Sequence, residues 1–208
     1  MSGALRRLAL GAVLFLFLAA TAGAGSAQQL RDRQLVYAYD LTNIQMPVEI
    51  LSIKLKGREI QTGQKIQGDD DWLRGLSFTL KNVSDKPIAY VNIGFQFPTS
   101  RGVVIYYLDY GVDYAHGDKR SSSSPPVINP GETLALVLSP ERYQVFQRML
   151  SQAGASASFD TAPYFVEKIS FEDDPDVIWA GGALRRRDPN NFWKFNVMER
   201  YVRPNRQK

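Results

Sequence analysis

Alternating apolar and polar residues predict two antiparallel strands in the first half of the chain. Apolar side chains occupy every second position from Leu76 to Leu80, and the alternation resumes from Ala89 to Phe97. The segment between them, Asn-Val-Ser-Asp-Lys-Pro at residues 82–87, has the composition of a turn. Each strand therefore has one apolar face. Because a strand pair is not stable alone, we expect further strands to cover that face.

The same two-residue period predicts more strands along the chain. They are residues 48–55, 103–110, 133–138, 163–171 and 177–179, with weaker candidates at 35–39 and 59–66. Together these patterns predict an all-β protein that folds as an antiparallel β-sandwich.

One segment has helical spacing instead. Ser139 is a suitable N-cap, and Pro140 suits the first helical position. The apolar side chains that follow recur three or four residues apart, at Tyr143, Phe146, Met149 and Leu150. The sequence therefore predicts one inserted amphipathic helix at about residues 139–152. We expect its aromatic stripe to pack on the core and the helix to plug one end of the sandwich.

The start of the chain has the pattern of a cleaved secretory signal peptide. Arg6 and Arg7 precede an apolar run from Leu8 to Ala20, and small residues then allow cleavage after Ala24 or Ala27. An uncleaved membrane anchor is the alternative, but the run is short for a bilayer span. We therefore expect a secreted or periplasmic protein. Its expected parts are a signal peptide (1–27), a linker or loosely ordered segment (28–46), the sandwich (47–198) and a basic tail (199–208).

Composition narrows the chemistry. The chain has no cysteine and a single histidine, His116, so disulfides, thiolate sites and the usual zinc ligand sets are excluded. The segment around His116, residues 113–126, contains four consecutive serines and predicts an exposed, mobile loop. A catalytic serine would need a rigid, oriented base, and the sequence has no Gly-x-Ser-x-Gly motif. We predict that the protein is not an enzyme.

Two acidic clusters, at residues 69–71 and 172–176, are candidate cation sites. Calcium prefers carboxylate oxygens, so Asp173, Asp174 and Asp176 are the candidate Ca²⁺ ligands; no other cofactor is expected. The alternative that we favour is that these are solvated turn residues. A third hypothesis is a glycan-directed hydrolase that uses Glu172 with the neighbouring aspartates.

Four tyrosines form a candidate binding surface beside the serine-rich loop: Tyr106, Tyr107, Tyr110 and Tyr114. Strand alternation places Tyr106 and Tyr110 on one face and Tyr107 on the other. Exposed tyrosines can stack on sugars or contact proteins, whereas the alternative is ordinary packing in the core and at the edge.

The C-terminal segment is basic and aromatic. From Arg185 to Lys208 there are eight lysines and arginines and two acidic residues. The candidate binding residues here are Arg185, Arg186, Arg187 and Trp193. Such a segment can bind anionic polymers or a membrane surface, and the alternative is a packed last strand with a solvated end.

Two turns, Asn82–Ile88 with its Asn-x-Ser sequence and Ile128–Glu132 with its Pro-Gly-Glu sequence, resemble those of bacterial immunoglobulin-like extracellular domains of the FxLYD type. Residues 171–179 and 185–191 also look like the endings of uncharacterised secreted bacterial proteins. The resemblance covers about residues 48–191. It implies an immunoglobulin-like sandwich and carries no catalytic residue to this chain.

These inferences predict a non-catalytic binding or interaction module of the bacterial envelope, with a protein or glycan partner and no nucleic-acid partner. A hydrolase and a Ca²⁺-stabilised structural domain are the competing hypotheses. An exposed sheet edge would allow a partner to add a strand, but the sequence does not identify which strand is the edge.

Overall fold

The computed structural model describes residues 30–39, 44–99, 102–155 and 159–204. The chain divides by its contacts into two units, residues 1–30 and 31–208, and the strands and helices named below belong to the second. The predicted signal peptide, residues 1–27, lies outside the described residues. In the described part of the chain, no helix is long and apolar enough to cross a membrane.

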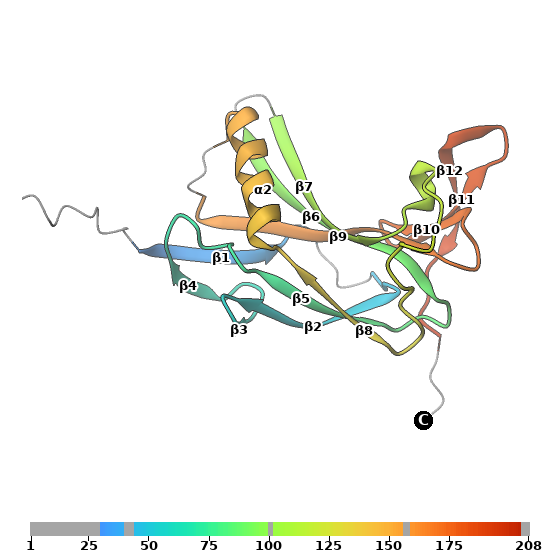
Figure 1. Cartoon of the computed structure of the whole chain (residues 1–208), viewed down its shortest axis with the longest axis horizontal. Helices are drawn as coiled ribbons and strands as arrows, with labels where there is room; N and C mark the ends of the chain where they lie inside the picture. Colours follow the sequence, from blue (N-terminus) through green and yellow to red (C-terminus); the bar gives the residue numbers. More distant parts are fainter. Residues whose placement is uncertain (1–29, 40–43, 100–101, 156–158, 205–208) are drawn as a thin grey trace, which may run out of the picture. The chain divides into compact units, whose positions relative to one another are not determined.

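Strands dominate the second unit (Figure 1). In chain order the elements are β1 (Arg31–Tyr37), β2 (Val48–Leu55), β3 (Arg58–Ile60), β4 (Lys65–Gly68), β5 (Ser77–Asn82), β6 (Ile88–Thr99), β7 (Gly102–Gly111), the 3-10 helix η1 (Tyr114–His116), β8 (Thr133–Val137), α2 (Pro140–Gln152), β9 (Thr161–Phe171), β10 (Val177–Ala180), β11 (Ala183–Asp188) and β12 (Asn191–Arg200).

The strands form two sheets around one apolar core. The smaller sheet has the order β3-β2-β5-β8. In the larger sheet β9 is central. β6 pairs with β9 along its length, and β7 pairs with the other edge of β6. β1 pairs with the first half of β9, and β10 pairs with the second half. Phe78 of the smaller sheet lies 5.3 Å from Tyr164 and 6.1 Å from Phe95 of the larger sheet, measured between ring centroids. The predicted all-β sandwich with one inserted helix is therefore confirmed.

One strand pair departs from the predicted antiparallel arrangement. β1 runs parallel to β9, with Gln34 opposite Thr161 and Tyr37 opposite Tyr164. Parallel neighbours need a long connection, and here most of the domain lies between the two strands. Residues 28–46 were expected to be a linker or a loosely ordered segment, with a weak strand candidate at 35–39, and the structure has a strand at residues 31–37 with Leu35 buried.

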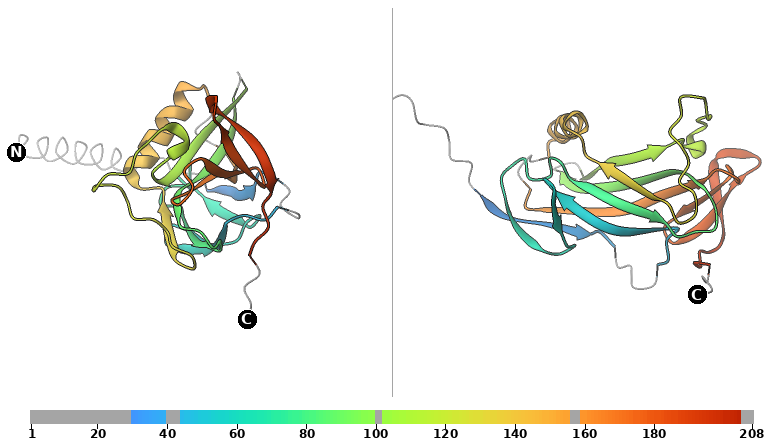
Figure 2. Two further views of the ribbon diagram at one scale, coloured as in Figure 1. Left: turned by 90° about the vertical axis from the view of Figure 1, so that its right-hand side faces the viewer. Right: turned by 60° about the horizontal axis from the view of Figure 1, so that its bottom comes forward.

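The inserted helix packs with its aromatic stripe on the core, as the spacing predicted. Ser139 caps α2 by accepting a hydrogen bond from the amide of Arg142. The ring of Phe146 lies 5.2 Å from Phe97 of β6 and 5.0 Å from Tyr106 of β7. The helix lies beside the β6–β7 hairpin, whereas β10, β11 and β12 gather towards the opposite end of the domain (Figures 1 and 2).

The predicted turn between β5 and β6 depends on a buried asparagine. The Asn82 side-chain amide donates to the carbonyls of Lys86 and Ile128, at 2.8 Å each. Its carbonyl accepts from the amide and the hydroxyl of Ser84, at 2.9 and 2.7 Å. The donors and the acceptor of the Asn82 side chain are therefore all hydrogen-bonded. Through these bonds Asn82 joins this turn to the Ile128–Glu132 turn, which precedes β8.

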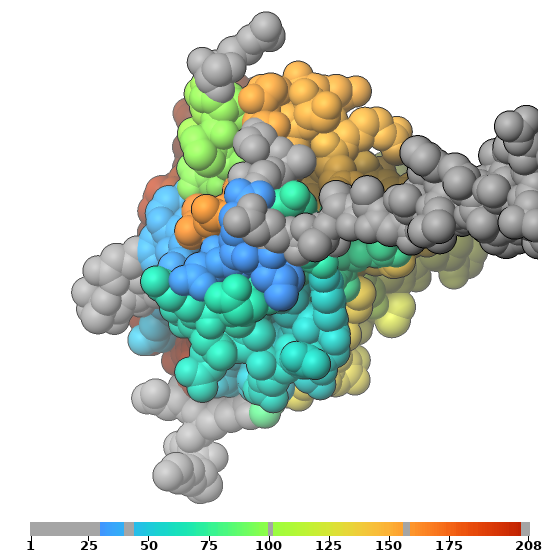
Figure 3. Space-filling view, turned by 90° about the vertical axis from the view of Figure 1, so that its left-hand side faces the viewer, coloured from blue at the N-terminus to red at the C-terminus, as the bar shows by residue number. Residues whose placement is uncertain are grey.

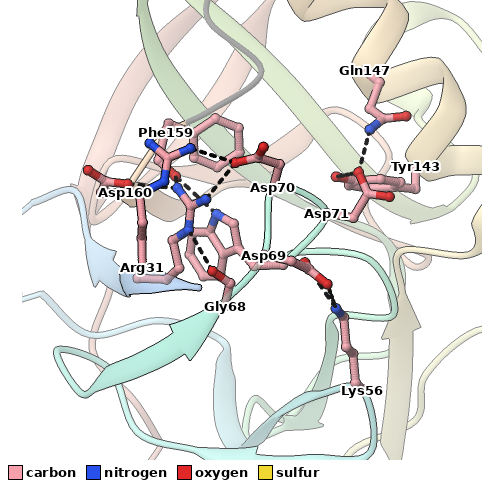
Figure 4. Close-up of polar contacts among 12 residues, drawn as sticks. Arg31, Lys56, Gly68, Asp69, Asp70, Asp71, Tyr143, Gln147, Phe159 and Asp160 are labelled. Atoms are coloured by element: carbon pink, nitrogen blue, oxygen red, sulfur yellow. Dashed lines mark hydrogen bonds and ion pairs between the residues drawn. The ribbon is translucent and has the colours of Figure 1, made fainter. Parts of the chain in front are cut away.

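A fully buried arginine ties β1 to three other segments. The Arg33 guanidinium donates to the Asp70 carboxylate at 2.8 Å, to Asp160 at 2.7 Å and to the Phe159 carbonyl at 2.8 Å, and its Nε donates to the Gly68 carbonyl at 3.3 Å. Figure 4 shows these acceptors grouped around the first residues of β1. A Cβ at Gly68 would lie 2.9 Å from the Arg33 side chain, so only glycine leaves room for it there. Seen from this end, the surface is built from β1, β4 and α2 (Figure 3).

We expect Arg33→Met to lower the free energy of unfolding by about 3 kcal/mol, because the Gly68 and Phe159 carbonyls lose their donor and the Asp70 and Asp160 carboxylates lose their buried partner. Arg31→Ala is the matched control: Arg31 shares the Asp70 carboxylate, but its side chain is 41% exposed. The control should lose less than about 1 kcal/mol. Urea unfolding monitored by tryptophan fluorescence measures both, and equal losses in the two variants would contradict the role assigned to Arg33.

Candidate functional site

The outer face of the larger sheet carries an aromatic floor. Gly94 of β6 faces Phe165 of β9 on one side and Tyr107 of β7 on the other. A Cβ at Gly94 would lie 2.6 Å from the Phe165 ring, so the glycine lets that ring lie across β6. The Tyr39 ring meets Phe165 edge-on, with 5.1 Å between the ring centroids.

A β-bulge at Glu167 lies on this face and changes which of the following residues point to it. Between β6 and β9 the register shifts so that Ile93 faces Val166 and Asn92 faces Lys168, which leaves Glu167 as the extra residue. Simple alternation along residues 163–171 would put Ile169 on the same face as Phe165 and Glu167. The bulge instead returns Ile169 to the core, while Phe165 stays outside it.

These residues surround a pocket of about 330 Å³, called here the Phe165 pocket. Its lining includes Tyr39, Ile44, Ile105, Phe165, Glu167 and Arg185. Its walls are mostly apolar, and the two charged groups have opposite sign. A larger depression of about 640 Å³ is lined by Glu49, Lys81 and Arg203, among others, and has no aromatic floor. The Phe165 pocket therefore combines apolar walls with a few polar groups, which is typical of a ligand site.

Glu167 is held in a fixed orientation at this pocket. Its carboxylate accepts hydrogen bonds from the Tyr107 hydroxyl at 3.0 Å and from the buried Asn92 amide at 2.8 Å. The Asn92 carbonyl in turn accepts from the main-chain amide of Lys168 at 2.8 Å. Burial and the nearby Glu167 charge raise the pKa of Tyr107 to about 12, so its hydroxyl remains a donor at neutral pH.

A second polar cluster anchors the segment that was predicted to be a mobile loop. The buried Asp113 carboxylate caps η1, pairs with the Lys168 ammonium and lies 2.6 Å from Nδ1 of His116. The Arg120 guanidinium pairs with Glu172 through two contacts of 2.8 Å. Nδ1 of His116 thus lies between the Asp113 carboxylate, at 2.6 Å, and the Lys168 ammonium, at 3.1 Å. These contacts tie residues 113–120 to the sheet.

The acidic turn after β9 is engaged by arginines. Asp174 pairs with Arg186 at 2.9 Å, and Asp176 pairs with Arg187 at 2.9 Å. Asp173 is exposed on the same turn. Among the residues that the structure describes, no three or more acidic, histidine or cysteine side chains are grouped to hold a metal ion. The Ca²⁺ hypothesis for these aspartates stays a prediction.

The other acidic cluster, residues 69–71, is also divided among separate partners (Figure 4). Asp69 pairs with Lys56 at 3.0 Å, and Asp70 pairs with Arg33. Asp71 accepts from Gln147 of α2 at 2.9 Å. The three carboxylates therefore join different segments of the fold instead of converging on one point.

The four tyrosines divide as strand alternation predicted. Tyr106 is buried against α2, and its hydroxyl donates to the Arg142 carbonyl at 3.2 Å. The Tyr110 hydroxyl donates to the Pro126 carbonyl, and the Tyr114 hydroxyl donates to Glu172. Tyr107 is on the opposite face, beside Glu167. Of the four, Tyr107 is therefore the one whose hydroxyl donates to a residue that lines the Phe165 pocket, Glu167.

The three consecutive arginines Arg185, Arg186 and Arg187 have different surroundings. Arg185 lines the Phe165 pocket, and its Nε donates to the Ala180 carbonyl. Arg187 is largely buried, and its guanidinium lies 4.0 Å from the ring centroid of Phe192 and 5.0 Å from that of Phe195. Trp193 is 70% exposed, close to His116. In part of the basic aromatic segment, the arginine and the aromatic rings therefore stack on each other within the fold.

Comparison with known protein families, with curated proteins and with solved structures found no match to this chain. The resemblance to the FxLYD-type domains stays a prediction. Sequence reasoning missed Phe165, Glu167 and Asn92 as site residues. The available signal was Gly94, because a glycine inside an otherwise apolar strand indicates that another group approaches closely.

Glu172 makes stability depend on pH. Burial alone would raise the pKa of Glu172, but the bonds from Arg120 and Tyr114 outweigh it and hold that pKa below its usual value of 4.5. Because the pKa is lower in the folded protein than in the unfolded chain, ionised Glu172 stabilises the fold at neutral pH. This contribution is lost as the pH falls through the folded-state pKa.

We therefore expect Glu172→Gln to have a lower free energy of unfolding than the parent protein at neutral pH, with the difference shrinking below about pH 4. Asp173→Asn is the control, since it removes an exposed carboxylate from the same turn. Urea unfolding at several pH values measures the difference. A gap between Glu172→Gln and the parent that stays constant into acid would show that the carboxylate is not the stabilising group.

Proposed function

We propose that this protein is a non-catalytic binding module of the bacterial envelope, and that it recognises a protein partner through the Phe165 pocket. The observation that carries the proposal is the combination of an aromatic floor with two oppositely charged groups, Glu167 and Arg185, in one small pocket. The placement at the envelope rests on the sequence of the first 27 residues.

The chemistry of the pocket suits an apolar side chain on a peptide. Ile105, Ile44 and the Phe165 ring provide apolar walls for such a side chain. The Glu167 carboxylate can accept from a peptide amide, and the Arg185 guanidinium can donate to a peptide carbonyl. An apolar anchor with polar groups beside it is the usual pattern of a specific binding pocket.

The site is also prepared for binding before a partner arrives. Tyr107 and Asn92 hold the Glu167 carboxylate, and the Gly94 gap holds the Phe165 ring. Groups that are already ordered lose little conformational entropy when a ligand binds, and this favours affinity.

The ion pairs of the acidic turn support this proposal over the hydrolase hypothesis. Glu172 and Asp174 each pair with an arginine, and Asp176 does so too. A general acid in a glycosidase needs a raised pKa, whereas the pKa of Glu172 is lowered. The contacts of these carboxylates favour a structural role.

The test is to select binders from a displayed library of random peptides on the full chain, and then to measure their affinities for variants by calorimetry. Ile105→Glu should weaken the selected peptides by more than about ten-fold, because it places a charge in the apolar pocket. Val103→Glu is the matched control on the same strand, since Val103 is exposed and lies outside the pocket.

Peptides with a shared apolar anchor that bind Val103→Glu normally and Ile105→Glu poorly would support the proposal. Selected peptides that bind Ile105→Glu as tightly as the parent protein would overturn it. Binding of sugars on a glycan array that is lost in Ile105→Glu would assign the pocket to a glycan instead of a protein.

A further inference from the structure

β12 is an unusual edge strand. It is ten residues long, and in the described part of the chain it pairs with β11 alone. Four large apolar side chains of β12 are well exposed: Phe192, Trp193, Val197 and Met198. Their exposed fractions range from 43% to 70%. A long edge with apolar side chains is a template on which another strand can pair.

Of the four other sheet edges in the described residues, three are very short or covered, and the fourth, β8, has five residues and one well-exposed large apolar side chain, Val137. β3 and β4 are only three and four residues long. β7 is flanked by α2. The Arg142 guanidinium of α2 donates to the main-chain carbonyl of Asp109, and the Arg142 main-chain carbonyl accepts from the Tyr106 hydroxyl. β12 has no proline and no covering helix, so its edge lacks these protections.

We propose that two copies of this chain associate through antiparallel pairing of β12, with Phe195 of one copy opposite Phe195 of the other. A two-fold axis perpendicular to the sheet relates the strands, so one residue must face its own counterpart. In this register Trp193 faces Val197 of the second copy, and Phe192 faces Met198. The exposed apolar side chains of β12 thus meet one another.

Neighbouring registers match less well. Centred on Lys194, the pairing would set Trp193 against Phe195 but would place two lysine side chains directly opposite each other. Centred on Asn196 or on Val197, it would set an aromatic ring, Trp193 or Phe195, against Glu199. Like charges opposite each other are destabilising, so the composition of the strand itself favours the Phe195 register and a second copy as the occupant.

The central part of β12 is suitably regular. Phe195, Asn196 and Val197 face Arg187, Arg186 and Arg185 in an unbroken ladder, and register shifts with β11 lie on both sides. The Arg187 guanidinium lies against the Phe195 ring and supports it. Regular pairing is therefore limited to a short stretch, and the dimer should be weak and concentration-dependent.

Single cysteines test the register directly, because the chain has no cysteine of its own. Phe195→Cys places two thiols opposite each other and should form disulfide-linked dimers under mild oxidation. Val197→Cys is the control: its counterpart lies four residues further along the pairing, roughly 13 Å away. A disulfide needs Cα atoms within about 7 Å. Crosslinking at 197 and not at 195, or equal crosslinking at both, would overturn the register.

Sedimentation velocity of the full chain over a range of concentrations tests the association itself. The parent protein should form dimers at high concentration, and Trp193→Lys should weaken them about ten-fold or more. Val145→Lys, which changes an exposed residue of α2, should leave association unchanged. A parent protein that stays monomeric at every concentration would overturn the proposal, as would equal weakening by both variants. Neither variant touches the Phe165 pocket, so this test is independent of the proposed function.

Discussion

The buried guanidinium of Arg33 is the interaction on which the rest of this structure depends. A charge that is fully removed from water is tolerated only if its donors meet acceptors at the same time. Here the acceptors come from β4, the 69–71 segment and the residues before β9. β1 can therefore take its place only when all three segments are assembled. This requirement couples the start of the domain to the centre of the larger sheet.

The position of β1 in turn shapes the Phe165 pocket. Because β1 runs parallel to β9, its end places Tyr37 beside Tyr164, and Tyr39 follows against the Phe165 ring. Glu167, at the bulge in β9, lies on the same outer face, where Tyr107 and Asn92 hold its carboxylate. The site is thus made from strands that are far apart in the sequence, and its geometry depends on how they pair.

Ion pairs account for most of the charged residues that first suggested function. The acidic turn after β9 and the arginines of β11 looked like two separate binding elements, one for a cation and one for an anion. In the structure they neutralise each other across a hairpin. Among the features that the structure describes, the Phe165 pocket on the sheet face and the apolar edge of β12 are the two on which the proposed interactions rest.

The sequence by itself determined the class of fold, the strands with regular alternation, the Asn82 turn and the capped helix. These depend on local periodicity and on residues that act within a few positions of one another. It indicated β1 only as a weak candidate at residues 35–39, because one of the two buried positions in that strand is an arginine whose partners lie in distant segments. Simple alternation also puts Ile169 on the wrong face, because a bulge of one residue inverts the alternation. Only the tertiary structure decided which aromatic rings form the pocket and which edge stays open, since both follow from long-range pairing that no local pattern records.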